Sequence, residues 1–518
     1  RCVQTMALPR IVITGASGFI GRHLLDTIKE RYQIVAMGRR SQRQCGAPVH
    51  PNIVWHQVDI GDCERLTALF HEIRDEGGAE LLIHLAAHYD FTGDEHPEYW
   101  RTNVEGLRNV LDLSRLLSLK RFIFASSVAA CRFPAPGKPL TETSPPDGEH
   151  IYAVTKRIGE KMLGEYAGDF PTLIVRFAAL FSDWCEYPPL FMFLETWLSR
   201  AWKARVLAGK GASAIPYLHI RDATAFLSTA LDRCDELAPG EILCASPDGS
   251  VNHRELFEAA TLYFRGHRIK PILMPKPICR VGLHAMDVTG RILGDRPFER
   301  PWMGKYIDLA LDVDAHRTRA QLGWVPRPRL EILRRLPFLV ENLKTDPVEW
   351  YRRNREAMKS VHLRVNLRIH QILENHEQEI REAFTALLVG SDKQTHLPHY
   401  EAIPDQEHHW HHRLILRSLL SSIRTRDRGV FKAYCRDLAE RRFAQGFDVE
   451  EVCYAVASLN QVCLHILQRD PATDGLDQPI HDLVTMTIQF GIDEIQEVFE
   501  QLGSGRTGSL PPDDASLR

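Results

Sequence analysis

Short apolar runs alternate with longer amphipathic stretches along the first third of the chain. The runs are rich in valine, isoleucine and leucine and occupy residues 11–13, 34–36, 53–58, 81–85 and 121–125. Strands that are apolar throughout are buried on both faces, as in parallel sheets whose crossover connections are helices. The pattern therefore predicts an α/β fold with a doubly wound parallel sheet, over residues 8–181 with parts of 210–250 contributing.

The pattern loosens between residues 182 and 345, where prolines recur and the apolar periodicity breaks up. This stretch predicts a smaller, loop-rich region that closes over the first domain and binds the substrate.

Helical periodicity dominates residues 350–502 and predicts an all-α domain. Its clearest helix starts at Asp448, a good N-cap, with Glu451 placed to complete a capping box. Two further helices are predicted over residues 363–373 and 431–438. The apolar face of the clearest helix consists of Val452, Ala455, Val456, Leu459, Val462, Ile466 and Leu467.

Length and composition agree with a soluble protein of several domains. The chain has 518 residues, too many for one core, with 44% hydrophobic residues, 25% charged residues and a net charge of -3. No strongly basic domain points to a nucleic-acid partner. Residues 503–518, rich in Gly, Ser, Pro and Asp, predict a disordered tail.

Cysteine usage and the absence of targeting signals predict a cytoplasmic location. The eleven cysteines form no C-x-x-C pair, which indicates reduced thiols. We recognise no signal peptide, and no apolar run is long enough to predict an integral membrane segment.

A glycine-rich turn follows the first predicted strand and opens a helix. Glycines allow a tight turn and a close approach of backbone to a pyrophosphate, and the helix N-terminus offers free N–H groups. A purely structural turn is the alternative. The cofactor-binding residues predicted here are Gly15, Ser17, Gly18, Phe19, Ile20 and Gly21.

The end of the second predicted strand favours NADPH over NADH. An acidic residue usually binds the ribose 2′-OH of NAD at this point, but this chain has Gly38 followed by Arg39 and Arg40. Guanidinium groups suit a 2′-phosphate. Solvated loop charges are the alternative, and NAD itself stays open.

Tyr152 and Lys156 are four residues apart, which places both on one face of a helix. A nearby ammonium lowers the pKa of a phenol, so we expect Tyr152 to exchange a proton near neutral pH. Ser127, at the end of a predicted strand, can hydrogen-bond a substrate oxygen.

Together these features resemble the extended short-chain dehydrogenases/reductases, of the NAD(P)-dependent epimerase/dehydratase and 3β-hydroxysteroid dehydrogenase kind. The resemblance spans roughly residues 8–345. It rests on residues 14–21, 59–60, 84–87, 103–106, 126–127, 152–156, Arg176 and 219–222.

The resemblance implies a Rossmann fold and roles for individual residues. Tyr152 would be the general acid/base, Lys156 would bind the nicotinamide ribose and tune Tyr152, and Ser127 would hold the substrate oxygen. Asp59 and Ile60 would contact the adenine. The remaining cofactor contacts implied are Leu85, Ala86, Ala87, Asn103, Phe177 and Ala179.

Departures from the family bear on the substrate. Nucleotide-sugar members carry an arginine where this chain has Ile215, and a diphosphate without that guanidinium loses a charge-assisted contact. Apolar and aromatic residues follow Phe181 and suit an apolar small molecule, unless they are simply core. The candidate pocket residues are Tyr89, Phe91, Ser127, Trp184 and Tyr187.

Three functions remain open at this point. The first is an NADPH-dependent reductase of a ketone or aldehyde on an apolar molecule, and the second is a nucleotide-sugar epimerase or dehydratase. The third is an NADP(H)-sensing regulatory protein, against which the intact Ser127, Tyr152 and Lys156 argue.

The C-terminal region, over about residues 360–502, resembles the RsbT co-antagonist N-terminal domain, a globin-like helical module of stressosome sensors. That resemblance implies sensing, homodimerisation or docking of a protein partner. His408 and His412 lie one helical turn apart in a histidine-rich segment, but no further ligand completes a set, so we expect no metal.

Overall fold

The computed structural model describes residues 8–199, 202–292, 298–358, 365–389, 397–470, 473 and 476–507. The chain divides into two compact units. The first consists of Arg1–Gly290 and Pro297–His362, and the second, here called the helical unit, of Arg291–Arg296 and Leu363–Arg518.

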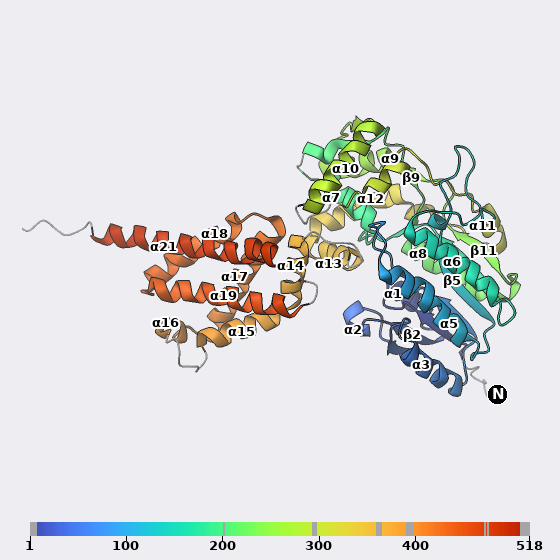
Figure 1. Ribbon diagram of the computed structural model, residues 1–518, viewed down its shortest axis with the longest axis horizontal. Coiled ribbons are helices and arrows are strands. Elements are labelled where there is room, and N and C mark those ends of the chain that lie inside the picture. Colours follow the sequence, from blue (N-terminus) through green and yellow to red (C-terminus); the bar gives the residue numbers. More distant parts are fainter. Residues whose placement is uncertain are drawn as a thin grey trace, which may run out of the picture. The chain divides into compact units, whose positions relative to one another are not determined.

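Seven parallel strands form the central sheet of the first unit, in the order β11–β6–β5–β4–β1–β2–β3 (Figure 1). This arrangement confirms the predicted doubly wound sheet, and all five predicted strands are present. The strands are β1 (Arg10–Thr14), β2 (Gln33–Gly38), β3 (Ile53–Gln57), β4 (Leu81–His84), β5 (Arg121–Ser127), β6 (Thr172–Phe177) and β11 (Glu241–Ala245).

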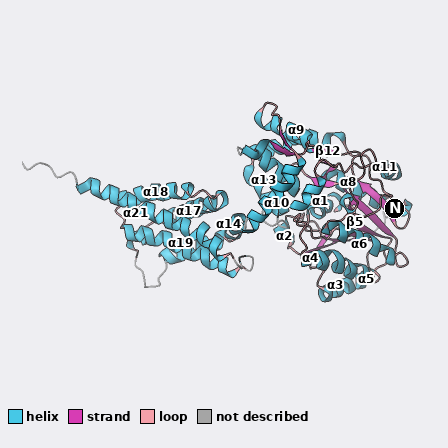
Figure 2. Ribbon diagram, turned by 45° about the horizontal axis from the view of Figure 1, so that its top comes forward, coloured by secondary structure: helices cyan, strands magenta, loops and turns pink. Residues whose placement is uncertain are grey.

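Helices cover both faces of this sheet (Figure 2). Ile11 and Ile13 of β1 belong to the core under one helical layer, whereas Val12 belongs to the core under the other. This is why the strands are apolar at every position. The first layer includes α1 (Phe19–Ile28) and α8 (Ile220–Asp232), and the second α3 (Cys63–Asp75), α5 (Leu107–Ser114) and α6 (Ile151–Glu165).

Short strand pairs and helices form the remainder of the first unit. The pairs are β7 (Ala179–Phe181) with β10 (Tyr217–His219), β8 (Val206–Ala208) with β13 (Ile272–Met274), and β9 (Ala214–Ile215) with β12 (Val251–Asn252). The helices are α2 (Gln42–Cys45), α4 (Pro97–Trp100), α7 (Pro188–Trp197), α9 (His253–Arg265), α10 (Lys276–Ile292), α11 (His316–Leu322), α12 (Ile332–Thr345) and α13 (Pro347–Met358).

The helical unit has one apolar core of its own. Its helices are α14 (Val365–Asn375), α15 (Glu377–Val389), α16 (Pro398–Glu401), α17 (Asp405–Thr425), α18 (Gly429–Ala444), α19 (Val449–Arg469), α20 (Asp477–Ile480) and α21 (Met486–Thr507). Residues 503–507 of the expected tail form the end of α21, and residues 508–518 lie outside the described residues, as do 363–364 of the first predicted helix.

Helix α19 confirms the predicted N-cap but not the capping box. The Asp448 carboxylate accepts the Glu450 N–H at 2.8 Å. Glu451 does not turn back to the cap, because its carboxylate binds His399 Nδ1 of α16 at 2.6 Å. The capping-box prediction is therefore wrong, since a tertiary partner takes the carboxylate that a local one was expected to use.

None of the helices in the described part of the chain has both the length and the apolarity that a membrane crossing requires.

Candidate active site

The turn between β1 and α1 is built for close backbone contact. Gly15 has φ +71°, which glycine adopts readily, and a Cβ there would lie 2.5 Å from the backbone nitrogen of Ala86. A Cβ at Gly21 would lie 2.6 Å from Ala16 Cα. Gly18 caps α1 without any side-chain hydrogen bond, so the first N–H groups of α1 stay available to a phosphate.

The other predicted residues of this turn lie between β1 and the first turn of α1. Ser17, Phe19 and Ile20 form the turn and the start of α1. The Leu85 N–H donates to the Thr14 carbonyl at 3.1 Å, which brings the 85–87 segment beside the turn.

The end of β2 leaves no room for an acidic side chain. A Cβ at Gly38 would lie 2.8 Å from both Cβ and Oγ of Ser17. Arg40 Nη2 donates to the Ser17 carbonyl at 2.5 Å, which holds this guanidinium beside the glycine turn. Arg39 is half-exposed and contacts Glu98 at 3.3 Å.

Asp59 lies beyond the end of β3 and pairs with Arg101. The Asp59 carboxylate accepts from Arg101 at 2.9 Å and from the Gly61 N–H at 2.9 Å. Partial burial acts to raise the pKa of Asp59, but these two hydrogen bonds outweigh it and hold the pKa below its usual value. The neighbouring Ile60 is buried, and its carbonyl accepts from Asn109 at 3.0 Å.

Helix α6 presents Tyr152 and Lys156 together, as predicted. His150 caps the helix, accepting the Ala153 N–H at 3.3 Å. Lys156 Nζ lies 5.6 Å from the centroid of the Tyr152 ring and donates to the Ala125 carbonyl of β5 at 2.7 Å. Burial lowers the pKa of Lys156 to about 8, against the opposing charge of Glu160.

Tyr152 differs from expectation in its ionisation. Burial raises the pKa of its phenol above the usual value. The expected lowering by Lys156 is not found, because removal of the phenol from water disfavours its charged form.

Of the two serines that end β5, only Ser127 is left to face a substrate. Ser126 Oγ donates to the Glu160 carboxylate at 2.6 Å. Ser127 Oγ accepts the Ala129 N–H at 3.1 Å and lies 3.5 Å from the Phe177 carbonyl. Phe177 itself is buried, with its ring packed against Phe226, so it offers backbone rather than side chain to the site.

Asn103 ties the loop after β4 to α6. Its side-chain oxygen accepts the His88 N–H at 2.6 Å, and its amide donates to the His88 carbonyl at 2.9 Å and to Thr155 Oγ1 at 3.1 Å. Thr155 in turn donates to the Tyr152 carbonyl at 2.8 Å. The side chain of Asn103 therefore has its hydrogen-bond partners, His88 and Thr155, within the protein.

A buried ion pair connects helix α6 to strand β6 of the sheet. Arg176 of β6 forms two hydrogen bonds with Glu160, at 3.0 Å and 2.8 Å, and the two side chains are 1% and 4% exposed. Bidentate pairs of this kind fix orientation as well as distance. Glu160 escaped sequence reasoning, although it lies one turn after Lys156.

Aromatic side chains surround Tyr152. The Tyr89 ring stacks on that of Tyr152 with centroids 4.0 Å apart and planes at 7°, and Phe91 packs on Tyr89 at 3.8 Å. Tyr187 meets Phe91 edge-on at 5.8 Å. We call Tyr89, Phe91, His150, Tyr187 and Trp302 the aromatic group.

The structure places three of the predicted pocket aromatics together and one apart. Tyr89, Phe91 and Tyr187 belong to the aromatic group, whereas Trp184 lies against the Arg353 guanidinium at 5.1 Å. Phe91 has φ +58°, a strained conformation for a bulky residue.

Sequence reasoning missed two members of the aromatic group, His150 and Trp302. The Trp302 ring lies 5.9 Å from that of His150, and its Nε1 donates to the Thr92 carbonyl at 2.7 Å. No local pattern marks Trp302, because it is brought to the site by folding of a distant loop.

In the helical unit, His408 and His412 of the histidine-rich segment form hydrogen bonds with other residues of the protein. His408 Nε2 lies 2.7 Å from the Tyr400 carbonyl, and His412 Nδ1 lies 2.9 Å from Thr385 Oγ1. Across the part of the chain that the structure describes, no three His, Cys, Asp or Glu side chains gather as a metal site would require.

Comparison with protein families divides the chain in the same way. Residues 11–245 match the NAD dependent epimerase/dehydratase family, and residues 391–500 match the RsbT co-antagonist protein rsbRD N-terminal domain.

Curated relatives align with parts of this chain. A putative dihydroflavonol 4-reductase of Synechocystis sp. is 31% identical over 132 residues, covering 25% of this chain and 36% of that protein. A 3beta-hydroxysteroid-dehydrogenase/decarboxylase of Arabidopsis thaliana is 22% identical over 342 residues, covering 61% and 75%. The chain covers 36%, 55% and 58% of the first three curated relatives.

Solved structures share the fold. An epimerase from Methanothermobacter thermautotrophicus superposes with a TM-score of 0.51 at 19% identity, covering 65% of this chain and 94% of that one. The UDP-glucose 4-epimerase of Thermotoga maritima, solved with UDP-glucose, gives 0.50 at 20% identity, covering 65% and 98%. At this level of identity the likeness concerns the fold alone.

Proposed function

We propose that this chain is an NADPH-dependent reductase of a carbonyl on an apolar small molecule, since residues 11–245 match the NAD dependent epimerase/dehydratase family. Tyr152 is the proton donor, Ser127 holds the substrate oxygen, and Lys156 positions the cofactor ribose. The domain boundaries proposed are a cofactor-binding domain at 8–181, with parts of 210–250, and a substrate region at 182–345.

The observation that carries this proposal is the aromatic surrounding of Tyr152. Its phenol lies within the aromatic group, with the Tyr89 ring 4.0 Å away. A neutral phenol can give its proton to an oxygen that gains electrons during reduction. Aromatic walls with few charges suit an apolar substrate rather than a sugar diphosphate.

The cofactor, when bound, supplies the hydride that reduces the carbonyl carbon. The residues of this chain bind the cofactor and orient the substrate. The glycine turn and the free N–H groups of α1 receive the pyrophosphate, and Ser127 Oγ holds the substrate oxygen near the Tyr152 hydroxyl. The remaining predicted cofactor contacts are Asp59, Ile60, Leu85, Ala86, Ala87, Phe177 and Ala179. The side chain of Asn103 instead binds His88 and Thr155.

The preference for NADPH rests on the end of β2. Gly38 has no space for the carboxylate that usually binds the ribose of NAD, since any Cβ would meet Ser17 at 2.8 Å. Arg39 and Arg40 stand next to that position and can pair with a 2′-phosphate.

The helical unit has a separate proposed role. Its match to the RsbT co-antagonist domain supports homodimerisation or docking of a protein partner rather than a second active site. A cytoplasmic location fits both parts.

The proposal is tested by following NADPH oxidation with a panel of apolar ketones and aldehydes, and with UDP-sugars as the competing substrates. We expect turnover with an apolar carbonyl compound. Tyr152→Phe is expected to lower kcat by about 100-fold or more, the range of general acid catalysis, with NADPH affinity unchanged. The matched control is Tyr166→Phe at the C-cap of the same helix, where the hydroxyl contacts Asp112 instead.

Two outcomes would overturn the proposal. Turnover of a UDP-sugar alone, without net NADPH loss, would make the chain an epimerase. Tight NADPH binding with no turnover of any panel member, and no effect of Tyr152→Phe, would favour the regulatory alternative.

A further inference from the structure

Helix α10 turns its apolar side to solvent. Ile278, Val281 and Val288 are 57%, 70% and 56% exposed. With Ala285 they recur every three or four residues, so they form one continuous stripe along the helix. Surface helices of soluble domains carry polar residues at such positions.

The buried side of α10 carries an acidic residue, Asp287, although acidic residues of surface helices usually face solvent. Asp287 is buried, 3% exposed, and pairs with the buried Arg300 at 3.4 Å. Cys279, two turns earlier in the helix, is also buried. The helix therefore buries its one acid while it exposes apolar side chains, and the Asp287–Arg300 pair holds that acid inward.

Two further apolar side chains are exposed in the strand before the helix. Ile272 and Leu273 of β13 are 52% and 41% exposed, whereas isolated exposed apolar residues elsewhere are ordinary. We call Ile272, Leu273, Ile278, Val281 and Val288 the α10 face. The stripe along α10 is an exposed apolar surface of the kind that marks an interaction site.

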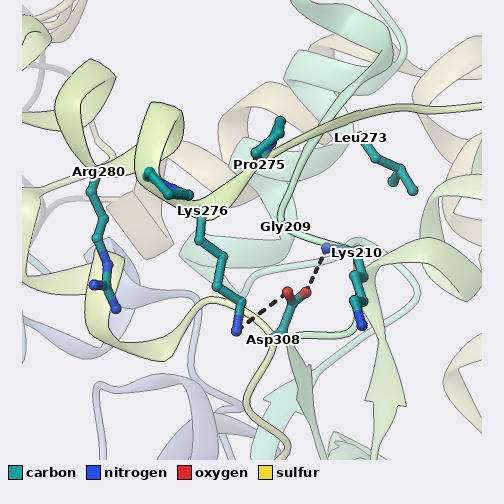
Figure 3. A pocket seen from close by; sticks show the side chains of 8 residues that line it. Gly209, Lys210, Leu273, Pro275, Lys276, Arg280 and Asp308 are labelled. Carbon is teal, nitrogen blue, oxygen red and sulfur yellow. Dashed lines mark hydrogen bonds and ion pairs between the residues drawn. The ribbon is translucent and has the colours of Figure 1, made fainter.

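The chain segment that carries the α10 face is positively charged. Residues 265–290 contain five lysines and arginines and a single acid, the buried Asp287, although the whole chain has a net charge of -3. A hollow of about 750 Å³ opens at the N-terminal end of α10, and Lys210, Lys276 and Arg280 line it (Figure 3). Its acid, Asp308, is already held by Lys276 at 3.5 Å and by the Lys210 N–H at 2.8 Å.

We propose that the α10 face docks on a membrane surface that contains anionic lipid. An apolar stripe with a cationic margin is the pattern of a helix that lies in the interface, with apolar side chains among the acyl chains and ammonium or guanidinium groups at the phosphates. The hollow supplies cations at the level of the headgroups.

Charge favours lipid over a second copy of this chain. A self-contact through the α10 face would bring two cationic margins together without an exposed acid on residues 265–290 to offset them. An anionic lipid surface complements both the apolar stripe and its margin.

Sedimentation of the full chain with vesicles tests the proposal without reference to any catalytic activity. We expect binding to phosphatidylcholine vesicles containing phosphatidylglycerol, weak binding to phosphatidylcholine alone, and loss of binding at high salt. The double variant Val281→Glu/Val288→Glu is expected to weaken binding by about tenfold or more, since it charges the centre of the stripe. Val49→Glu/Val325→Glu is the control, because these valines are 85% and 63% exposed outside the α10 face.

Each further outcome decides the matter. Absence of vesicle binding by the unmodified chain overturns the proposal, as does equal weakening by both double variants. If the unmodified chain is a dimer in light scattering and Val281→Glu/Val288→Glu alone makes it a monomer, the face is a self-interface instead. Circular dichroism of each variant checks that it is folded.

Discussion

Burial acts in opposite directions on the two central groups of the site. It raises the pKa of the Tyr152 phenol and lowers the pKa of the Lys156 ammonium to about 8. Both shifts have the same cause, since desolvation disfavours whichever form is charged. The sequence suggested that Lys156 would dominate Tyr152, but the depth of burial decides the ionisation of both.

The rate of reduction is expected to fall as pH rises through about 8, where Lys156 loses its charge. The measurement is the pH profile of kcat/KM, which reports groups of the free enzyme. Lys156→Arg keeps a cation at high pH and should move this alkaline limb upward. An unchanged limb in that variant would contradict the assignment.

Unfolding does not explain the same limb. The folded pKa of Lys156 is about 8, below its ordinary value of 10.5. Between these values the unfolded chain binds more protons, so the contribution of Lys156 to stability rises with pH. Thermal melts across this window separate the two effects.

Arg39 is expected to carry part of the preference for NADPH. Arg39→Ala should raise the Kd for NADPH by about tenfold, the worth of one charge-assisted hydrogen bond, and leave the Kd for NADH unchanged. Fluorescence titration with each cofactor measures this. Arg43→Ala is the matched control, because Arg43 is exposed on α2 beyond the cofactor turn. Equal weakening of NADPH and NADH would contradict recognition of the 2′-phosphate.

Helix α6 is held at three points, and each belongs to a different element. Lys156 reaches the end of β5, Glu160 pairs with Arg176 of β6, and Thr155 receives the Asn103 amide. Tyr152 therefore has a fixed position because its helix is fixed, whatever lies in the pocket.

Asn103 is expected to act on Tyr152 through α6. Asn103→Asp removes the donor to Thr155 and to the His88 carbonyl at a cost of about 1–3 kcal/mol. Steady-state kinetics should show a lower kcat with little change in cofactor affinity. Asn109→Asp, which loses a donor to the Ile60 carbonyl, is the comparison. A rise in the cofactor Kd with unchanged kcat would instead support the direct cofactor contact that the family resemblance implies.

The two compact units have separate cores, so a change in one core should leave the other intact. Each can then be destabilised by itself.

Gly491→Ala tests this separation. A Cβ at Gly491 would lie 2.5 Å from Phe431 Cε1 and 2.7 Å from Cys435 Sγ, inside the core of the helical unit. Such overpacking costs about 1–3 kcal/mol, so calorimetry should show a lower Tm for one transition while NADPH binding is retained.

Gly503→Ala is the control for that change. Nothing lies within 4 Å of a Cβ at Gly503 on the same helix, so alanine should be neutral or stabilise by up to about 1 kcal/mol. A single transition that moves as a whole in Gly491→Ala, with loss of NADPH binding, would show that the two units unfold together.

The local pattern of apolar and polar residues was enough to predict the parallel sheet of the first unit. The sheet strands were predicted because strands covered on both faces must be apolar at every position, as Ile11, Val12 and Ile13 are. The glycine turn and the Tyr152–Lys156 spacing were visible for the same reason, since a tight turn and a helix face depend on neighbouring residues only.

Tertiary structure decided what neighbouring residues could not. The stacking of Tyr89 on Tyr152, the arrival of Trp302 and the diversion of Glu451 to His399 join segments far apart in sequence. The pKa of Tyr152 depends on how completely those segments exclude water, so it too belongs to the folded chain. The exposed stripe of α10 likewise has a helical pattern in sequence, and only the burial of Asp287 shows that this pattern faces outward.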